Sequence, residues 1–137
     1  INKLIGAQSI VVSIDIFYKD KNYYIYNYVD KNIINLDIKK YIELIQKIGI
    51  GEILITMVNL DGTMQGPDIN IIKFLQDYIS VPLIYKGGAS SLNDIKTIIS
   101  TDVNVFTSST IFIMKKLNGG IVFNYPSESE KMKYGIL

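Results

Sequence analysis

The chain has 137 residues, of which 48% are apolar, and a formal net charge of +1. This is enough apolar material for the core of one domain, and the interspersed charges exclude a basic surface for nucleic acid and a cationic amphipathic helix for a membrane. Cysteine and histidine are absent, so disulfides and the commonest metal ligand are unavailable, and proton transfer must depend on Asp, Glu, Lys or Tyr. We also expect no metal and no cofactor.

No apolar run reaches the ~20 residues that a membrane span requires, and no charged-then-apolar leader is visible. We therefore expect a cytoplasmic protein whose partners are small molecules or proteins. The chain starts with Ile1 instead of Met, and its first residues resemble a helix end followed by a loop. This start is expected not to be the natural one.

The first half of the chain is expected to contain two strands with a helix between them. The β-branched run at 9–15 predicts a strand that is buried on both faces. Tyr and Ile residues at 22–30 predict a hairpin excursion. Apolar residues at helical spacing follow Asp37, which can cap a helix that ends at Gly49. The run EILITMV at 52–58 predicts the second strand.

The second half is expected to repeat this alternation. Asp68 can cap a helix with an apolar face, and Ser91 with Asp94 matches a capping box for another helix. The runs at 81–88 and 103–109 predict the third and fourth strands.

Alternating strands and helices, at roughly 20 to 30 residues per unit, predict parallel strands joined by right-handed crossovers. An open doubly wound sheet would carry a glycine-rich phosphate-binding sequence after its first strand, and SIDIFYKD contains none. We therefore predict an α/β fold in which residues 1–137 form the C-terminal half of a (βα)8 TIM barrel, with an extended tail near 120–126. A whole barrel takes ~250 residues, so this chain cannot close one by itself.

Three acidic residues lie at strand ends. Asp15 ends an apolar run, where a carboxylate is costly unless it is used or hydrogen-bonded, although a strand end that meets solvent would be ordinary. Asp61 precedes Gly62, a pair that is more often a turn than a catalytic site. Glu52 shares its parity with Thr56, so a barrel would point both inward with Glu52 at the bottom; a solvated strand start is the alternative.

Small residues follow the third and fourth strands, where barrels usually bind a phosphate group. These residues are Gly87, Gly88, Ser108 and Ser109. Ser90 and Ser91 open the next helix, so backbone N–H groups and a helix N-terminus could face an anion.

Four segments, GAQSIVVSID, GIGEILITMVNLDGTMQGPD, KGGASSLND and TSSTIF, resemble in order and spacing the C-terminal half of the cyclase subunit (HisF) of imidazole glycerol phosphate synthase. The resemblance covers nearly the whole chain. It implies an enzyme of histidine biosynthesis, of the lyase and synthase type, that is inactive as an isolated half. In that family, ammonia from a glutaminase partner travels through the barrel to aminate and cyclise a phosphorylated ribulosyl substrate.

The resemblance also implies residue roles. Asp15 matches one of two catalytic aspartates, and Glu52 matches an acid in the ring of charges at which ammonia enters. The candidate catalytic residues are Asp15 and Asp61. The candidate phosphate-binding residues are Gly62, Gly87, Gly88, Ser108 and Ser109. Thr56, Asn59 and Lys86 are expected to line the same pocket.

Three residues depart from the family's pattern. Lys86 replaces a small residue, Asn59 replaces an aspartate, and Phe17 replaces a lysine. Lys86 could strengthen anion binding or reshape the pocket. The segment GGIVFNYPSESEK resembles the tail of a paralogous branch found in surface-polysaccharide clusters, which delivers ammonia for the amidination of a nucleotide-activated sugar.

Three functions stay open: the histidine-pathway cyclase, the ammonia-delivering paralogue, and a non-catalytic phosphosugar-binding module. The expected partners are a glutaminase, a phosphorylated small molecule, and either an N-terminal half barrel or a second copy of the chain. Because a half barrel exposes the edges of its first and fourth strands, the isolated chain is predicted to dimerise or aggregate.

Overall fold

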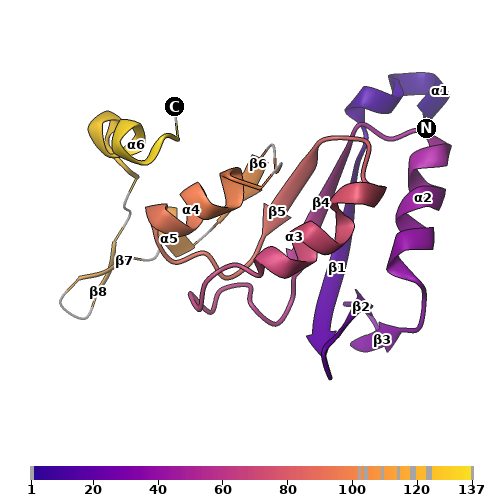
Figure 1. Ribbon diagram of the computed structural model, residues 1–137, viewed down its shortest axis with the longest axis horizontal. Helices are drawn as coiled ribbons and strands as arrows, with labels where there is room; N and C mark the ends of the chain where they lie inside the picture. Colours follow the sequence, from indigo (N-terminus) through magenta and orange to yellow (C-terminus); the bar gives the residue numbers. More distant parts are fainter. Residues whose placement is uncertain are drawn as a thin grey trace.

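The computed structural model describes residues 2–101, 103, 105–108, 110–113, 115–117, 120–122 and 125–136. A six-stranded sheet with the order β3-β2-β1-β4-β5-β6 forms its centre (Figure 1). The strands of this sheet are β1 (Val11–Lys19), β2 (Asn22–Asn27), β3 (Asn32–Ile34), β4 (Glu52–Met57), β5 (Leu83–Lys86) and β6 (Val105–Thr107).

The described residues also form helices. They are α1 (Asn2–Ile5), α2 (Ile38–Ile48), α3 (Ile69–Leu75), α4 (Leu92–Ile99), α5 (Thr110–Ile113) and α6 (Glu128–Tyr134), with 3-10 turns η1 (Ala7–Ser9) and η2 (Gln76–Tyr78). Of these, α2, α3 and α4 separate the parallel strands along the chain. A separate two-stranded sheet pairs β7 (Lys115–Leu117) with β8 (Gly120–Val122). Strands β1, β4, β5 and β6 pair in parallel in the larger sheet, which is open. The predicted α/β fold of the half-barrel type is therefore confirmed.

Strand β1 is longer than expected. It continues to Lys19, four residues past the predicted end at Asp15, because its second half pairs antiparallel with β2. The turn between them is formed by Asp20 (φ 50°) and Lys21 (φ 63°), which matches the positive φ angles of a type I′ hairpin turn. In Figure 1 this hairpin lies at the end of the sheet opposite to α1.

The hairpin changes the expected strand edge. Strand β2 pairs with the part of β1 from Ile16 to Lys19, so it covers the C-terminal part of an edge that was predicted to be exposed. Strand β3 extends this antiparallel region. Self-association of the isolated chain stays a prediction.

Alternate strand residues form the core with the helices. Their side chains bury the sheet face that α2, α3 and α4 cover, and all belong to one apolar cluster. On the strands these residues are Ile14, Ile16, Ile53, Ile55, Met57, Leu83 and Tyr85, and on the helices Ile38, Ile42, Ile45, Ile71, Ile72, Leu75, Ile95 and Ile98. The opposite face is open: Val11 on β1 is 50% exposed and Val105 on β6 is 46% exposed.

The helix starts follow the predicted capping residues. The Asp37 carboxylate accepts hydrogen bonds from the backbone N–H groups of Lys39 and Lys40, and Gly49 ends α2 with a φ of 87°. The Asp68 carboxylate caps α3, and Ser91 with Asp94 forms the capping box of α4. Helix α3 is shorter than its apolar pattern suggested, because it passes into η2 at Gln76.

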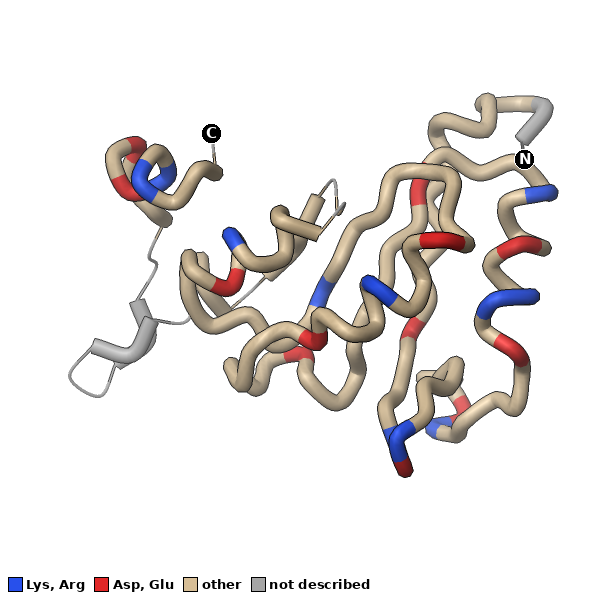
Figure 2. The backbone as a smooth tube through the Cα atoms, in the orientation of Figure 1, with Lys and Arg blue, Asp and Glu red and all other residues tan. Residues whose placement is uncertain are grey.

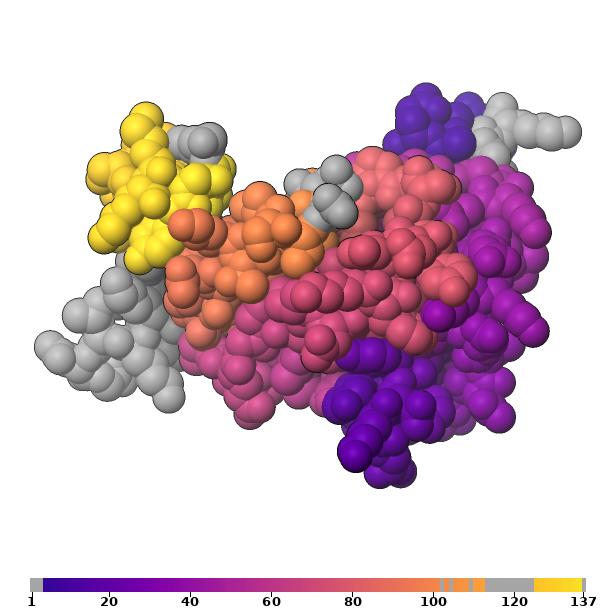
Figure 3. Space-filling model, in the orientation of Figure 1, coloured from indigo at the N-terminus to yellow at the C-terminus, as the bar shows by residue number. Residues whose placement is uncertain are grey.

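The C-terminal region contains a helix that the sequence analysis missed. Helix α6 begins after Ser127, whose hydroxyl and the Glu130 carboxylate form a capping box, and it ends at Gly135 with a φ of 67°. Figure 3 shows α6 beside α4, and the two helices are in contact. The Tyr125 ring also lies 5.6 Å from the Phe112 ring of α5. The expected extended segment near 120–126 includes β8, while 123 and 124 lie outside the described residues.

Charges of both signs are scattered over the elements (Figure 2). Along the described backbone, positions of both signs alternate, in agreement with the interspersed charges of the sequence. Over the described part of the chain, every helix is too short or too polar to cross a membrane.

Candidate functional site

A row of polar side chains crosses the open face of the sheet. Asp15 on β1 is in register with Thr56 on β4, which is in register with Lys86 on β5 and then Thr107 on β6. In-register residues of parallel strands point to the same side, and neighbouring strands lie ~4.8 Å apart. A carboxylate, a hydroxyl, an ammonium and a second hydroxyl are therefore aligned near the C-terminal ends of the parallel strands.

Asp15 does not end its strand, which corrects the sequence-based prediction. It lies inside β1, one residue before the last parallel pair, which joins Ile16 to Met57. The antiparallel hairpin prolongs the strand beyond this point. Asp15 still faces the open side at the C-terminal end of the parallel part, as a catalytic carboxylate at a barrel mouth would.

The loop after β4 brings a second carboxylate to the row. The N–H groups of Leu60 and Asp61 both donate to the Met57 carbonyl, so the chain turns tightly after the strand. The Asp61 carboxylate then lies 2.8 Å from the Lys86 ammonium, and the two side chains are 34% and 33% exposed. Of the residues predicted for this pocket, Asp15, Thr56, Lys86 and Asp61 are thus brought together.

Asn59, in the same loop, has its side chain bonded to the backbone of β1. Its amide oxygen accepts a hydrogen bond from the Tyr18 N–H (3.2 Å), and its amide NH2 donates to the Tyr18 carbonyl (3.1 Å). The side chain therefore imitates a backbone peptide group and continues the pairing of β1 with β4. An aspartate could accept but could not donate here. The structure gives Asn59 a structural contact, not a place in the row.

Gly87 and Gly88 allow close approach of the chain to itself. A Cβ atom on Gly88 (φ 79°) would lie 2.0 Å from the Gly66 carbonyl oxygen, and the Gly66 N–H donates to the Gly88 carbonyl at 2.8 Å. A Cβ atom on Gly87 (φ 126°) would lie 3.0 Å from Met57. These two glycines therefore let the loop after β4 dock on the end of β5.

Gly62 differs from these two glycines. It has a φ of 78°, and a Cβ atom built on it would have no other atom within 4 Å. It lies in the exposed part of the loop next to Asp61. Its positive φ is needed for the turn, and the space beside it is open.

The start of α4 is occupied by a carboxylate of the chain itself. The Asp94 carboxylate accepts from the N–H groups of Ser90 (2.8 Å) and Ser91 (3.1 Å) and from the Ser90 hydroxyl (2.8 Å). Burial disfavours its charged form, but these hydrogen bonds outweigh burial and lower the pKa of Asp94. The prediction that these serine N–H groups face a ligand anion is therefore wrong, because Asp94 already satisfies them.

Ser108 lies at the junction of two loops. Its hydroxyl is 3.1 Å from the Thr110 hydroxyl and accepts from the Ile111 N–H at 3.3 Å. The buried Thr110 hydroxyl donates to the Ala89 carbonyl at 2.9 Å. The segments after β5 and β6 are thus joined, and Thr110 is the joining residue that the sequence analysis missed; phosphate binding at this corner stays a prediction. Ser109 lies outside the described residues.

Glu52 lies at the other end of the open face. It begins β4, in register with Val11 of β1, and it is partly buried. Thr56 is four positions further along the strand, which corresponds to about 13 Å. The structure therefore does not bring Glu52 to the row, and its place at an ammonia entrance stays a prediction.

Two tyrosines hold the start of α3, and the sequence analysis missed both. The Tyr23 hydroxyl donates to the Asp68 carboxylate (2.9 Å), and the Tyr85 hydroxyl accepts from the Asp68 N–H (2.8 Å). Burial raises the pKa of both hydroxyls, and the Asp68 charge raises them further. Both therefore stay protonated near neutral pH. Through these bonds β2 and β5 both contact the start of α3. Tyr23 is 45 positions and Tyr85 is 17 positions from Asp68 in the chain, so no local pattern indicates either contact.

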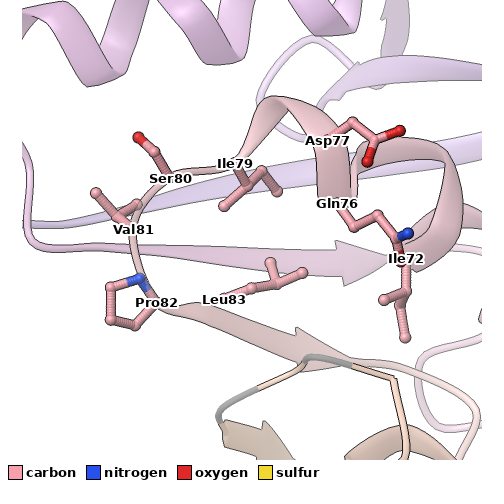
Figure 4. A pocket seen from close by; sticks show the side chains of 8 residues that line it. All are labelled: Ile72, Gln76, Asp77, Ile79, Ser80, Val81, Pro82 and Leu83. Atoms are coloured by element: carbon pink, nitrogen blue, oxygen red, sulfur yellow. The ribbon is translucent and has the colours of Figure 1, made fainter.

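A hollow of about 400 Å³ opens at the beginning of β5 (Figure 4). It lies at the opposite end of this strand from Lys86. Its lining residues are Ile72, Gln76, Asp77, Ile79, Ser80, Val81, Pro82 and Leu83. None of the predicted site residues is among them, so the row on the open face is the better candidate site.

Comparisons with known proteins agree with the resemblance. Residues 1–118 match the family model described as "Histidine biosynthesis protein". The "Putative imidazole glycerol phosphate synthase subunit hisF3" of Vibrio vulnificus is 31% identical over 134 residues, which are 94% of this chain and 51% of that relative. The corresponding putative subunit of Leptospira borgpetersenii is 33% identical over 134 residues, with 93% and 51% covered.

A further relative is the "Imidazole glycerol phosphate synthase subunit HisF" of an Exiguobacterium species. It is 37% identical over 86 residues, which are 63% of this chain and 34% of that relative. The chain thus spans about half, or less, of the length of these curated relatives. With 118 matched residues, it belongs to the histidine biosynthesis protein family, an enzyme family that includes the HisF subunits of imidazole glycerol phosphate synthase.

Proposed function

We propose that the whole protein is a cyclase subunit of the imidazole glycerol phosphate synthase type. It uses ammonia from a glutaminase partner to aminate and cyclise a phosphorylated ribulosyl substrate. The observation that supports this best is the row of Asp15, Thr56 and Lys86, with Asp61 beside it, on the open face of the parallel strands. The names of the relatives support the same reaction.

Asp15 is the proposed general acid and base. Replacement of a carbonyl oxygen by ammonia to form an imine requires that ammonia lose two protons and that the departing oxygen gain both, so that it leaves as water. With histidine absent from the chain, a carboxylate that faces the substrate is well suited to both transfers. Asp61 is the second catalytic candidate, positioned by its ion pair with Lys86.

The phosphate group of the substrate is proposed to bind where three loops meet. Gly62 supplies the open turn after β4, and Thr110 ties the loops after β5 and β6 together. The remaining residues proposed for this corner are Gly87, Gly88, Ser108 and Ser109. Closely spaced backbone N–H groups and hydroxyls suit a phosphate group.

Ammonia is proposed to enter beside Glu52 and to move along the open face toward Asp15. The residues between these two on β1 and β4 are Ser13 and Leu54, which are in register with each other. A small hydroxyl and an apolar side chain would neither bind ammonia tightly nor protonate it. In a closed barrel this face would line the interior.

A second candidate acceptor is a nucleotide-activated sugar that is amidinated in surface-polysaccharide synthesis. The alignments with the putative subunits of Vibrio vulnificus and Leptospira borgpetersenii cover 94% and 93% of this chain. They therefore include most of the tail, whereas the match to the Exiguobacterium subunit covers 63%. The tail and Lys86 are the features that favour this alternative.

The test is ammonia-dependent turnover of the whole protein with its glutaminase. Asp15→Asn is expected to lower kcat by about 100-fold to 10,000-fold and to leave ligand affinity nearly unchanged, because proton transfer matters mainly in the transition state. Asp20→Asn, at the exposed hairpin turn, is the matched control and should retain activity. Unchanged turnover in Asp15→Asn would remove this residue from the mechanism.

The same assay separates the acceptors. Turnover with the phosphorylated ribulosyl substrate supports the cyclase, whereas turnover only with a nucleotide-activated sugar and its amidotransferase supports the paralogue. Phosphate binding without any ammonia-dependent turnover would instead indicate a non-catalytic phosphosugar-binding module.

A further inference from the structure

Lys86 places a positive charge in the middle of the open face. It is the last residue of β5, in register with Thr56 on one side and Thr107 on the other. Its backbone is held by the sheet, so its position does not depend on a flexible loop. Asp15 lies two strands away, at about 10 Å from backbone to backbone.

The Asp61 carboxylate neutralises this charge only in part. A lysine ammonium has three donors, and the contact with Asp61 Oδ2 at 2.8 Å uses one of them. Both side chains are about one-third exposed, at 33% and 34%, so the ammonium remains accessible from the open side. It can bind a second anionic oxygen while Asp61 holds its position.

Asp61 acts on an incoming anion in two opposite ways. It orients the ammonium, but its own charge repels an anion that approaches the same donors. Because Lys86 is on a strand and Asp61 is on a loop, removal of the Asp61 charge would leave the Lys86 backbone in place and make the ammonium more available to an anion.

We propose that Lys86 is a specificity-determining residue, which selects ligands that carry a phosphate group beside the row of Asp15, Thr56 and Thr107. This inference rests on the proposed function, since it assumes that a phosphorylated ligand binds at this face. It adds that the positive charge which recognises the ligand is on β5, and that the Asp61 carboxylate weakens the attraction of this charge for phosphate. Because the two side chains form an ion pair, the Lys86 charge raises the affinity for phosphate and the Asp61 charge lowers it.

The test is the dissociation constant of inorganic phosphate, measured by calorimetry on the whole protein. Lys86→Met, which keeps the length without the charge, is expected to weaken binding about 10-fold, since a charge-assisted hydrogen bond is lost. Asp61→Asn is expected to bind phosphate more tightly than the unmodified protein. Lys86→Arg is the control that keeps the charge and should retain the affinity.

Opposite effects of Lys86→Met and Asp61→Asn on the dissociation constant of phosphate support the inference. The dissociation constants of the two variants should approach each other at high salt, because salt screens both charges. If both variants bind phosphate equally weakly, the ion pair serves only to hold the loop, and the inference is wrong. Unchanged affinity in Lys86→Met, or absence of phosphate binding by the unmodified protein, would also overturn it. If Lys86→Met fails to fold by circular dichroism, Lys86→Ser provides the same comparison.

These outcomes are independent of the ammonia assay. Turnover with no Lys86 effect on phosphate binding would leave the proposed function standing without this inference. Opposite effects of the two variants without any ammonia-dependent turnover would leave Lys86 as the phosphate-selecting residue of a binding module.

Discussion

The two faces of the sheet are made from the same strands, yet they differ in chemistry. The face covered by helices presents isoleucines, such as Ile53 and Ile55, which are 0% and 1% exposed. The open face presents Asp15, Thr56 and Lys86 at the same height on neighbouring strands. Because successive side chains alternate between faces, one short strand can supply both the core and the candidate site. Stability and function are therefore separated by residue parity.

The largest loss of stability is expected from a substitution on the face of the sheet that the helices cover. Ile55→Ala removes a fully buried side chain from the middle of β4 and should lower the free energy of unfolding by about 2 to 5 kcal/mol. Its neighbour Leu54 points to the open face and is only partly buried, so Leu54→Ala should cost less. Urea unfolding measures both. Equal losses would contradict the separation of the two faces.

A smaller effect concerns the connection between the open face and the hairpin. Asn59→Asp keeps the shape of the side chain but removes the donor to the Tyr18 carbonyl, so two oxygens then face each other. This should cost about 1 to 3 kcal/mol in the free energy of unfolding. Asn70→Asp, in the exposed first turn of α3, is the matched control, because a negative charge is favourable there. If Asn59→Asp is as stable as this control, the hydrogen bonds of Asn59 do not contribute to stability.

The smallest effect depends on pH and concerns the start of α4. The folded pKa of Asp94 is lowered, so its contribution to stability is present above the unfolded value of about 3.9 and is lost as the pH falls through the folded pKa. Asp94→Asn should therefore destabilise the protein at pH 7, and the difference from the unmodified protein should shrink toward pH 3.

Urea unfolding across this pH range measures the effect, with Asp77→Asn at an exposed position as the control. A stability difference that does not change between pH 7 and pH 3 would show that the Asp94 charge is not responsible.

Much of the fold was predictable because its signals are local. Asp37 and Asp68 start helices by accepting from N–H groups two or three residues away, and the period of the apolar residues marks the strands and helices. The same kind of local signal, Ser127 with Glu130, was present at the start of α6 and was missed. The extension of β1 to Lys19 was missed because pairing with β2 sets it.

The candidate site was predictable only in part. Strand ends and the resemblance indicated Asp15, Asp61, Gly87 and Gly88, but not which of their atoms meet. Asn59 was expected in the pocket, whereas its amide continues the pairing with Tyr18. Ser90 and Ser91 were expected to face an anion, whereas Asp94 accepts from both.

By itself, the sequence determined the alternation of strands and helices and which residues share a face, because both follow from the period of the backbone and from capping within one turn. Tertiary structure alone decided the register that aligns Asp15, Thr56 and Lys86, and the ion pair that brings Asp61 to them. Strand register and loop docking depend on contacts between residues far apart in the chain, and no local pattern specifies the geometry of such contacts.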